Sequence, residues 1–178
     1  GDSFAKASFF IGLIIILFLT VYLFVFYSSA AYSAFFKDFT PDDTKITQAI
    51  FDANAIGKAL ADGLTELIFI IAIPAVFLGL GFLIYKFSEE EGKIKYLKVG
   101  CLVLVTLCFD FIIAYAIVKE IYNIMIGGMF QEMPPMTIGR AFQEIHLWII
   151  IFAGFVVYII WGLVFSFTMN EYEKLDKV

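Results

Sequence analysis

The sequence is poor in charge, in histidine and in cysteine. Asp, Glu, Lys and Arg make up 16% of its 178 residues, whereas soluble domains contain about 25%. There is one histidine, His146, and there are two cysteines. The few lysines are scattered and form no basic tract. A nucleic-acid-binding protein needs such a tract as its electrostatic footprint, so we expect no nucleic-acid partner.

The same scarcity argues against a metal site, a disulfide and an enzyme. A metal site needs several His, Cys or carboxylate ligands at suitable spacing, and none is spaced in this way around His146. Cys101 and Cys108 lie in one apolar run, about 10 Å apart along a helix, which is too far for a disulfide. No Ser–His pair, glycine-rich phosphate loop or paired-carboxylate motif is present. We therefore expect no cofactor, no metal ion and no catalysis.

Apolar side chains are abundant instead. They make up 62% of the chain, 22 of them are Phe, and the mean hydropathy is +0.93. Ordinary soluble domains are roughly 45–50% apolar. A chain of this size could not bury so much apolar surface in water, so its solvent is predicted to be lipid.

Four apolar segments are long enough to cross a hydrocarbon core of about 30 Å. They cover residues 8–30, 67–85, 99–118 and 147–168. Backbone polar groups must be satisfied internally in lipid, so each segment is predicted to be a helix. The expected fold is an all-α integral membrane protein, with a single four-helix transmembrane domain over residues 1–178.

The outer loops carry signals for short interfacial helices. Thr40 followed by Pro41 predicts a helix start, and a second helical pattern begins near Asn54 and is expected to continue into the second span. In the other outer loop, Thr137 is predicted to cap a helix that continues into the fourth span and projects beyond the bilayer.

The distribution of lysine predicts the orientation. Four spans place both termini and the central connection on one side of the membrane. The short connection 86–98 carries four lysines, and cytoplasmic loops are enriched in Lys and Arg. We therefore expect both termini to be cytoplasmic, although the sequence does not identify the membrane.

One acidic residue, Asp110, interrupts the third apolar segment. It lies about 18 Å from Lys98 and about 13 Å from Lys119 along the helix. A charge at this depth is costly, so we expect Asp110 to be neutral. Counting along the other spans predicts further residues at the same depth or on the same face: Thr106, Pro74, Thr20 and Tyr158. This group is interpreted as a proton or cation site, or alternatively as a packing site within the chain or against a partner.

Two further groups are candidates for function. Asp62 and Glu66 follow Lys58 on one helix face at the entry to the second span. They are interpreted as an acidic mouth that concentrates cations, with Lys58 and Asp62 able to form an ion pair. Small residues on one face of the fourth span predict a close-packing seam within the chain or between copies: Gly154, Gly162 and Ser166. Methionines predict a soft contact surface in the second outer loop: Met125, Met129, Met133 and Met136.

Two functional hypotheses follow. In the first, the protein is an oligomeric channel, pore or ion-conducting subunit for protons or cations, with Asp110 as its sensitive residue. In the second, it is a non-catalytic structural subunit of a larger membrane complex, such as a secretion, defence or energy-transducing assembly. Both require the lipid bilayer, and both expect self-association or contact with other membrane subunits.

Overall fold

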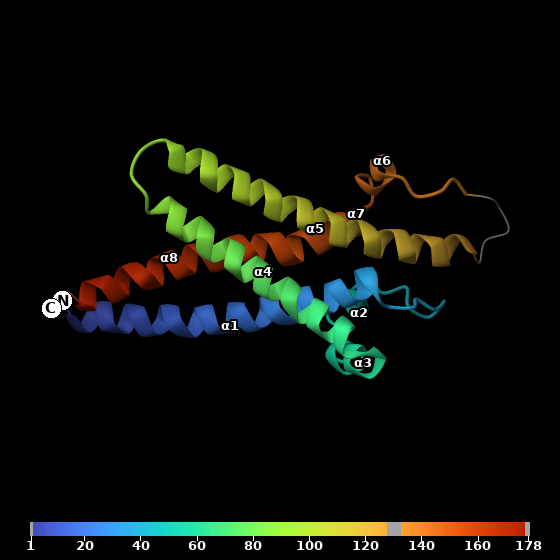
Figure 1. Ribbon diagram of the computed structural model, residues 1–178, viewed down its shortest axis with the longest axis horizontal. Helices are drawn as coiled ribbons and strands as arrows, with labels where there is room; N and C mark the ends of the chain where they lie inside the picture. Colours follow the sequence, from blue (N-terminus) through green and yellow to red (C-terminus); the bar gives the residue numbers. More distant parts are fainter. Residues whose placement is uncertain (1, 128–132, 177–178) are drawn as a thin grey trace.

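The computed structural model describes residues 2–127 and 133–176, and all regular structure in this part of the chain is helical (Figure 1). Four helical stretches are long and apolar enough to cross a membrane: Ser3–Phe35, Leu64–Ser88, Ile94–Gly127 and Ile145–Asp176. The chain is therefore a polytopic, all-α integral membrane protein, as the sequence predicts.

All four membrane helices are longer than the apolar segments that predict them. Helix α1 (Asp2–Phe35) and helix α5 (Ile94–Gly127) each contain 34 residues, so each is about 51 Å long. The hydrocarbon core is about 30 Å thick. Each helix therefore projects beyond the core, because no proline or glycine follows the apolar run closely enough to stop it there.

The remaining membrane helices complete a bundle around α1. Helix α8 (Val157–Asp176) lies along α1, and helix α4 (Leu64–Ser88) crosses both (Figure 1). Gly12 of α1 faces Thr168 of α8, where the absence of a side chain at Gly12 leaves space for the Thr168 side chain. Both termini and the α4–α5 connection lie at one end of the bundle, and the smaller helices lie at the other, the outer end (Figure 1).

The first outer connection differs from the prediction at its start. Thr40 and Pro41 do not begin a helix, because the Asp43 carboxylate accepts hydrogen bonds from the Thr40 amide (2.8 Å) and hydroxyl (2.9 Å) and closes a turn. Helix α2 (Ile46–Ile50) begins after this turn and buries its apolar face. It is fixed to α1 by the Ser33 hydroxyl, which donates to the Ala49 carbonyl over 2.6 Å.

Two long helices that the sequence predicts are each interrupted. Helix α3 (Ala55–Asp62) follows Asn54 as predicted, but it ends at Gly63, whose φ of 146° favours glycine. Thr137 caps helix α6 (Ile138–Ala141), as predicted, by accepting from the Arg140 amide. The chain then breaks before helix α7 (Ile145–Ile151), and the Trp148 indole satisfies the Phe142 carbonyl at this break over 2.8 Å. The predictions of continuous helices are therefore wrong at both places.

Candidate functional site

Asp110 lies inside the bundle formed by a single chain. Its side chain belongs to α5, and the residue is 3% exposed. The Tyr27 hydroxyl of α1 donates to Asp110 Oδ1 over 2.7 Å. Thr106, one turn earlier on α5, is also buried and donates its hydroxyl to the Leu102 carbonyl. The carboxyl group at the membrane centre is therefore held by a hydroxyl of the same chain.

The second carboxyl oxygen has a different environment. Asp110 Oδ2 is buried, and so is Tyr158 Oη of α8; neither makes a hydrogen bond within the part of the chain that the structure describes. The Tyr158 ring lies near Tyr27 through Phe77, which stacks on the Tyr27 ring and meets the Tyr158 ring edge-on with 6.4 Å between centroids. Buried polar atoms without partners are rare and costly. We refer to Tyr27, Thr106, Asp110 and Tyr158 together as the Asp110 cluster.

Aromatic rings enclose this cluster. The Tyr27 ring stacks on Phe77 of α4, with 3.8 Å between centroids and 13° between planes. The Phe26 ring meets the Tyr27 ring edge-on at 5.0 Å. Pro74, predicted at the depth of Asp110, is buried one turn before Phe77, and α4 continues through it as one helix. Helix α4 thus contributes an apolar wall to the cluster.

A π-helical turn gives the Tyr27 hydroxyl its space. The turn is η1 (Phe152–Val156), which joins α7 to α8. A Cβ at Gly154 would lie 2.5 Å from the Phe26 ring and 3.0 Å from Tyr27 Oη. The Tyr22 hydroxyl donates to the Ala153 carbonyl in this turn over 2.7 Å. Single π-helical turns occur frequently at functional sites, and this one lies directly against the Asp110 cluster.

The sequence argument missed Tyr27 and named Thr20 instead. The hydrogen bond to Asp110 places Tyr27, and not Thr20, at the depth of the carboxyl group. Thr20 lies seven residues earlier and accepts a hydrogen bond from the Trp161 indole over 2.9 Å. Thr20 therefore belongs to the contact between α1 and α8 and lies apart from the cluster.

The small residues of the fourth span are in unlike surroundings. Gly154 is buried and packs closely within the chain. A Cβ at Gly162 would have no atom of a neighbouring residue within 4 Å, and Ser166 is half-buried. The close contact within this chain is therefore at Gly154, and the seam as a contact between copies stays a prediction.

The acidic residues at the predicted mouth lie where α3 meets α4. Asp62 and Glu66 are on either side of the Gly63 break. Lys58 forms its ion pair with Asp52, over 3.1 Å, rather than with Asp62 as predicted. The reason is that Asp52 is fixed beside the start of α3, where its carboxylate also accepts from the Asn54 amide.

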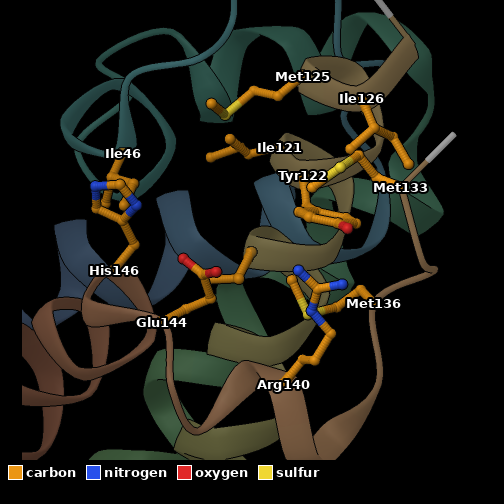
Figure 2. A pocket seen from close by; sticks show the side chains of 11 residues that line it. Ile46, Ile121, Tyr122, Met125, Ile126, Met133, Met136, Arg140, Glu144 and His146 are labelled. Atoms are coloured by element: carbon orange, nitrogen blue, oxygen red, sulfur yellow. The ribbon is translucent and has the colours of Figure 1, made fainter. Parts of the chain in front are cut away.

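A separate pocket of about 250 Å³ opens at the outer end of α5 (Figure 2). Met125, Met133 and Met136 line it, whereas Met129 lies outside the described residues. The guanidinium of Arg140 faces the Tyr122 ring, with 5.3 Å between Arg140 Cζ and the ring centroid. The α5 residues of this pocket begin at Val118, about 12 Å along the helix from Asp110, so the pocket and the Asp110 cluster are distinct sites.

Neither metal chemistry nor relatives assign a role to these sites. In residues 2–127 and 133–176, no group of three or more His, Cys, Asp or Glu side chains could hold a metal ion. Comparisons of the chain with protein-family models, curated proteins and solved structures find no match. A functional assignment therefore has to rest on the chemistry of the sites themselves.

Proposed function

We propose that the protein is an ion-conducting subunit of a membrane channel or pore, in which the Asp110 cluster is the site through which a proton or cation passes. One observation carries this proposal. Asp110 is buried near the middle of a membrane helix, where one oxygen accepts a hydrogen bond from Tyr27 and the other makes none within the described part of the chain. Ionisable groups at this depth are expensive, and they typically mark ion pathways or proton relays.

The acidic residues at the outer end support the same function. Asp62 and Glu66 lie at the outer entry to α4. Carboxylates at an entrance raise the local concentration of cations and protons. Glu66 lies about 12 Å along α4 from Pro74. Pro74 is one turn before Phe77, which forms the α4 wall of the Asp110 cluster. An ion attracted to this mouth would thus enter near the helix that leads to the site.

A second candidate function is that of a non-catalytic subunit in a larger membrane assembly. The bond between Tyr27 and Asp110 favours it, because this bond joins α1 to α5 within one chain, as a packing role requires. In that case the methionine-lined pocket at the outer end offers a surface for another subunit.

Flux measurements in liposomes distinguish the two functions. Purified wild type is compared with Asp110→Asn, and the oligomeric state of each is measured in the same detergent. Glu120→Gln is the matched control, because Glu120 is an exposed acid on the same helix. Flux that is lost in Asp110→Asn and kept in Glu120→Gln supports conduction. Absence of flux from folded wild type would overturn it and favour the assembly subunit, whose partners would then be isolated from native membranes.

We also infer that both termini are cytoplasmic, as the lysines of the α4–α5 connection suggest. Protease protection of a tag at either terminus in sealed vesicles tests this orientation. Cleavage of the tag by protease added on the outer side of the membrane would show the opposite orientation.

A further inference from the structure

We propose that the outer pocket, the hollow of about 250 Å³ at the outer end of α5, binds the head group of a zwitterionic membrane phospholipid, with the phosphate on Arg140 and the ammonium group on Glu144. This site goes beyond the proposed function, because neither conduction nor the Asp110 cluster requires it. The proposal follows from the depth of the pocket, from the separation of its two opposite charges and from an apolar groove on the same face of α5.

The outer pocket lies at the level of the lipid head groups. Its α5 residues run from Val118 to Ile126, about 12 to 24 Å along the helix from Asp110. The hydrocarbon core ends about 15 Å from the centre of the membrane, and the head groups lie directly outside it. The pocket therefore crosses the boundary at which a phospholipid changes from acyl chain to head group.

One cation and one anion of the outer pocket do not pair with each other. Arg140 and Glu144 are both half-buried, and both line the pocket on the side opposite Met125 (Figure 2). In the described part of the chain, these two side chains form no ion pair with each other. Opposite charges that share a pocket and remain apart are complementary to a ligand that carries both charges.

The local structure keeps the two charges apart. The Arg140 guanidinium faces the Tyr122 ring and donates from Nη1 to the Pro134 carbonyl over 3.3 Å. The Tyr122 hydroxyl donates to the same carbonyl. Glu144 lies at the break before α7, where its backbone is extended and its side chain does not cap the helix. Arg140 is thus held from one side, and the Glu144 carboxylate is not used to begin α7.

The chemistry of the two groups fits a phospholipid head group. A guanidinium has five N–H donors in a planar fork that matches the oxygens of a phosphate. A carboxylate accepts charge-assisted hydrogen bonds from an ammonium group. Phosphatidylethanolamine carries a phosphate and an ammonium group on one head group, so it can satisfy Arg140 and Glu144 together. Phosphatidylglycerol carries the phosphate alone and would place its charge beside an unpaired Glu144.

The walls and the size of the outer pocket favour a lipid over a water-soluble zwitterion. Several of its lining side chains are apolar and buried: Ile46, Val118, Ile121 and Met136. A cavity of about 150 Å³ holds benzene, so a pocket of about 250 Å³ holds a head group and the start of its chains. The rest of the chains must then leave the pocket into the bilayer.

An apolar groove of about 450 Å³ supplies a path for one chain. It is lined by side chains of α5 and of the segment around the α6–α7 break, among them Leu107, Phe111, Phe142, Trp148 and Ile151. Phe111 in this groove and Tyr122 in the outer pocket are eleven residues apart, which is about three helical turns, so both hollows lie on the same face of α5. The groove is the one nearer the membrane centre, where the surrounding solvent consists of acyl chains.

Brominated lipids test the site through Trp148, because bromine on an acyl chain quenches the fluorescence of a tryptophan that it contacts. Purified protein in mixed micelles receives brominated phosphatidylethanolamine or brominated phosphatidylglycerol. We expect the first lipid to quench at about tenfold lower mole fraction. This preference should disappear in Trp148→Phe, because Trp161 donates to Thr20 at the contact between α1 and α8. Equal quenching of wild type by both lipids would overturn recognition of the head group.

Arg140→Gln and Glu144→Gln test the two ends of the head group, with Lys119→Gln and Glu120→Gln as matched controls. Lys119 and Glu120 are exposed on α5 and do not line the outer pocket. We expect Arg140→Gln to weaken quenching by both lipids, and Arg140→Lys, which keeps the charge, to weaken it less. Glu144→Gln should remove the preference for phosphatidylethanolamine, whereas both controls should keep it. An unchanged preference in folded Glu144→Gln would overturn the ammonium contact.

Soluble phosphoethanolamine distinguishes a membrane lipid from a free zwitterion, because it has the same head group without the chains. Its binding to the detergent-solubilised protein is measured by calorimetry. Lipid-selective quenching without binding of phosphoethanolamine is the result that we expect. Binding of phosphoethanolamine without selective quenching would overturn a membrane lipid as the occupant. Failure of both would overturn the site and leave the outer pocket to the partner subunit of the second candidate function.

Discussion

The membrane centre and the outer end of the molecule stabilise acidic side chains in opposite ways. At the centre, Asp110 is buried, its partner is the neutral hydroxyl of Tyr27, and its surroundings are aromatic. At the outer end, Asp52 is paired with the cation of Lys58, whose side chain is 47% exposed. Lipid forbids a free charge and favours neutral hydrogen bonds, whereas water tolerates loose ion pairs of small energy. The comparison predicts that equivalent substitutions cost far more at the centre than at the outer end.

The largest contrast is expected between two glycines of the fourth span. Gly154→Ala places a Cβ 2.5 Å from the Phe26 ring, and overpacking of this kind costs about 1–3 kcal/mol. Gly162→Ala meets no neighbouring atom within 4 Å and gains helix propensity of up to about 1 kcal/mol. Thermal unfolding in detergent, followed by circular dichroism, measures both. Equal midpoints for the two variants would show that η1 does not hold Tyr27 in place.

The next contrast is between two tyrosine hydroxyls. Tyr27→Phe removes the hydrogen bond to buried Asp110 and leaves Oδ1 without a partner, which costs about 1–3 kcal/mol. Tyr122→Phe removes a hydrogen bond to the Pro134 carbonyl at the exposed outer end, where water replaces it. Unfolding of both variants under the same conditions gives the comparison. A larger loss for Tyr122→Phe would mean that the outer pocket, and not the Asp110 cluster, stabilises the fold.

The membrane helices could be predicted from the sequence because lipid imposes one rule on the whole chain. Apolar runs of sufficient length must become helices, and the four spans and the central position of Asp110 follow directly. The ends of the helices did not follow, because polar residues continue a helix as readily as apolar ones once it leaves the hydrocarbon. The partner of Asp110 in α1, Tyr27, did not follow either, because the apolar pattern of α1 does not fix its position along α5.

The breaks in the outer helices depend on interactions that local patterns do not carry. Asp43 closes a turn onto Thr40 where a capping motif predicted a helix. The Trp148 indole satisfies the Phe142 carbonyl from six residues away. Gly63 was a local signal for the break between α3 and α4, because glycine readily adopts a positive φ. Side-chain hydrogen bonds that compete with the helix therefore decided the regions around Thr40 and Phe142, whereas Gly63 decided the break between α3 and α4.

A small effect is expected at the Lys58–Asp52 ion pair. The hydrogen bond that Lys58 donates to Asp52, which is the largest cause, and the negative charge of Asp52 raise the pKa of Lys58. The stabilisation is therefore complete below the unfolded pKa of lysine and is lost only at more alkaline pH. Exposed pairs contribute about 0.2–1 kcal/mol, so Lys58→Met should lower the unfolding midpoint slightly at low salt and not at all at high salt. A large fall in the unfolding midpoint that persists in high salt would show that this pair contributes strongly to stability, and it would weaken the contrast with Asp110.

The smallest effect is expected at Asp43, and it depends on pH. Hydrogen bonds from the Thr40 amide and hydroxyl lower the pKa of Asp43. A carboxyl group with a lowered pKa stabilises the folded turn above its unfolded value, about 3.9, and this contribution is lost as the pH falls through the folded value. The Thr40 amide signal in NMR spectra should therefore shift with a midpoint below about pH 3.9. The Asp43→Asn variant can still accept through its side-chain oxygen and should show no such titration.

Because the turn is exposed, global unfolding should not follow this step. A midpoint above 3.9 would mean that the turn is held by contacts other than the carboxylate, and that the outer end depends less on water-exposed charge than the comparison with Asp110 requires.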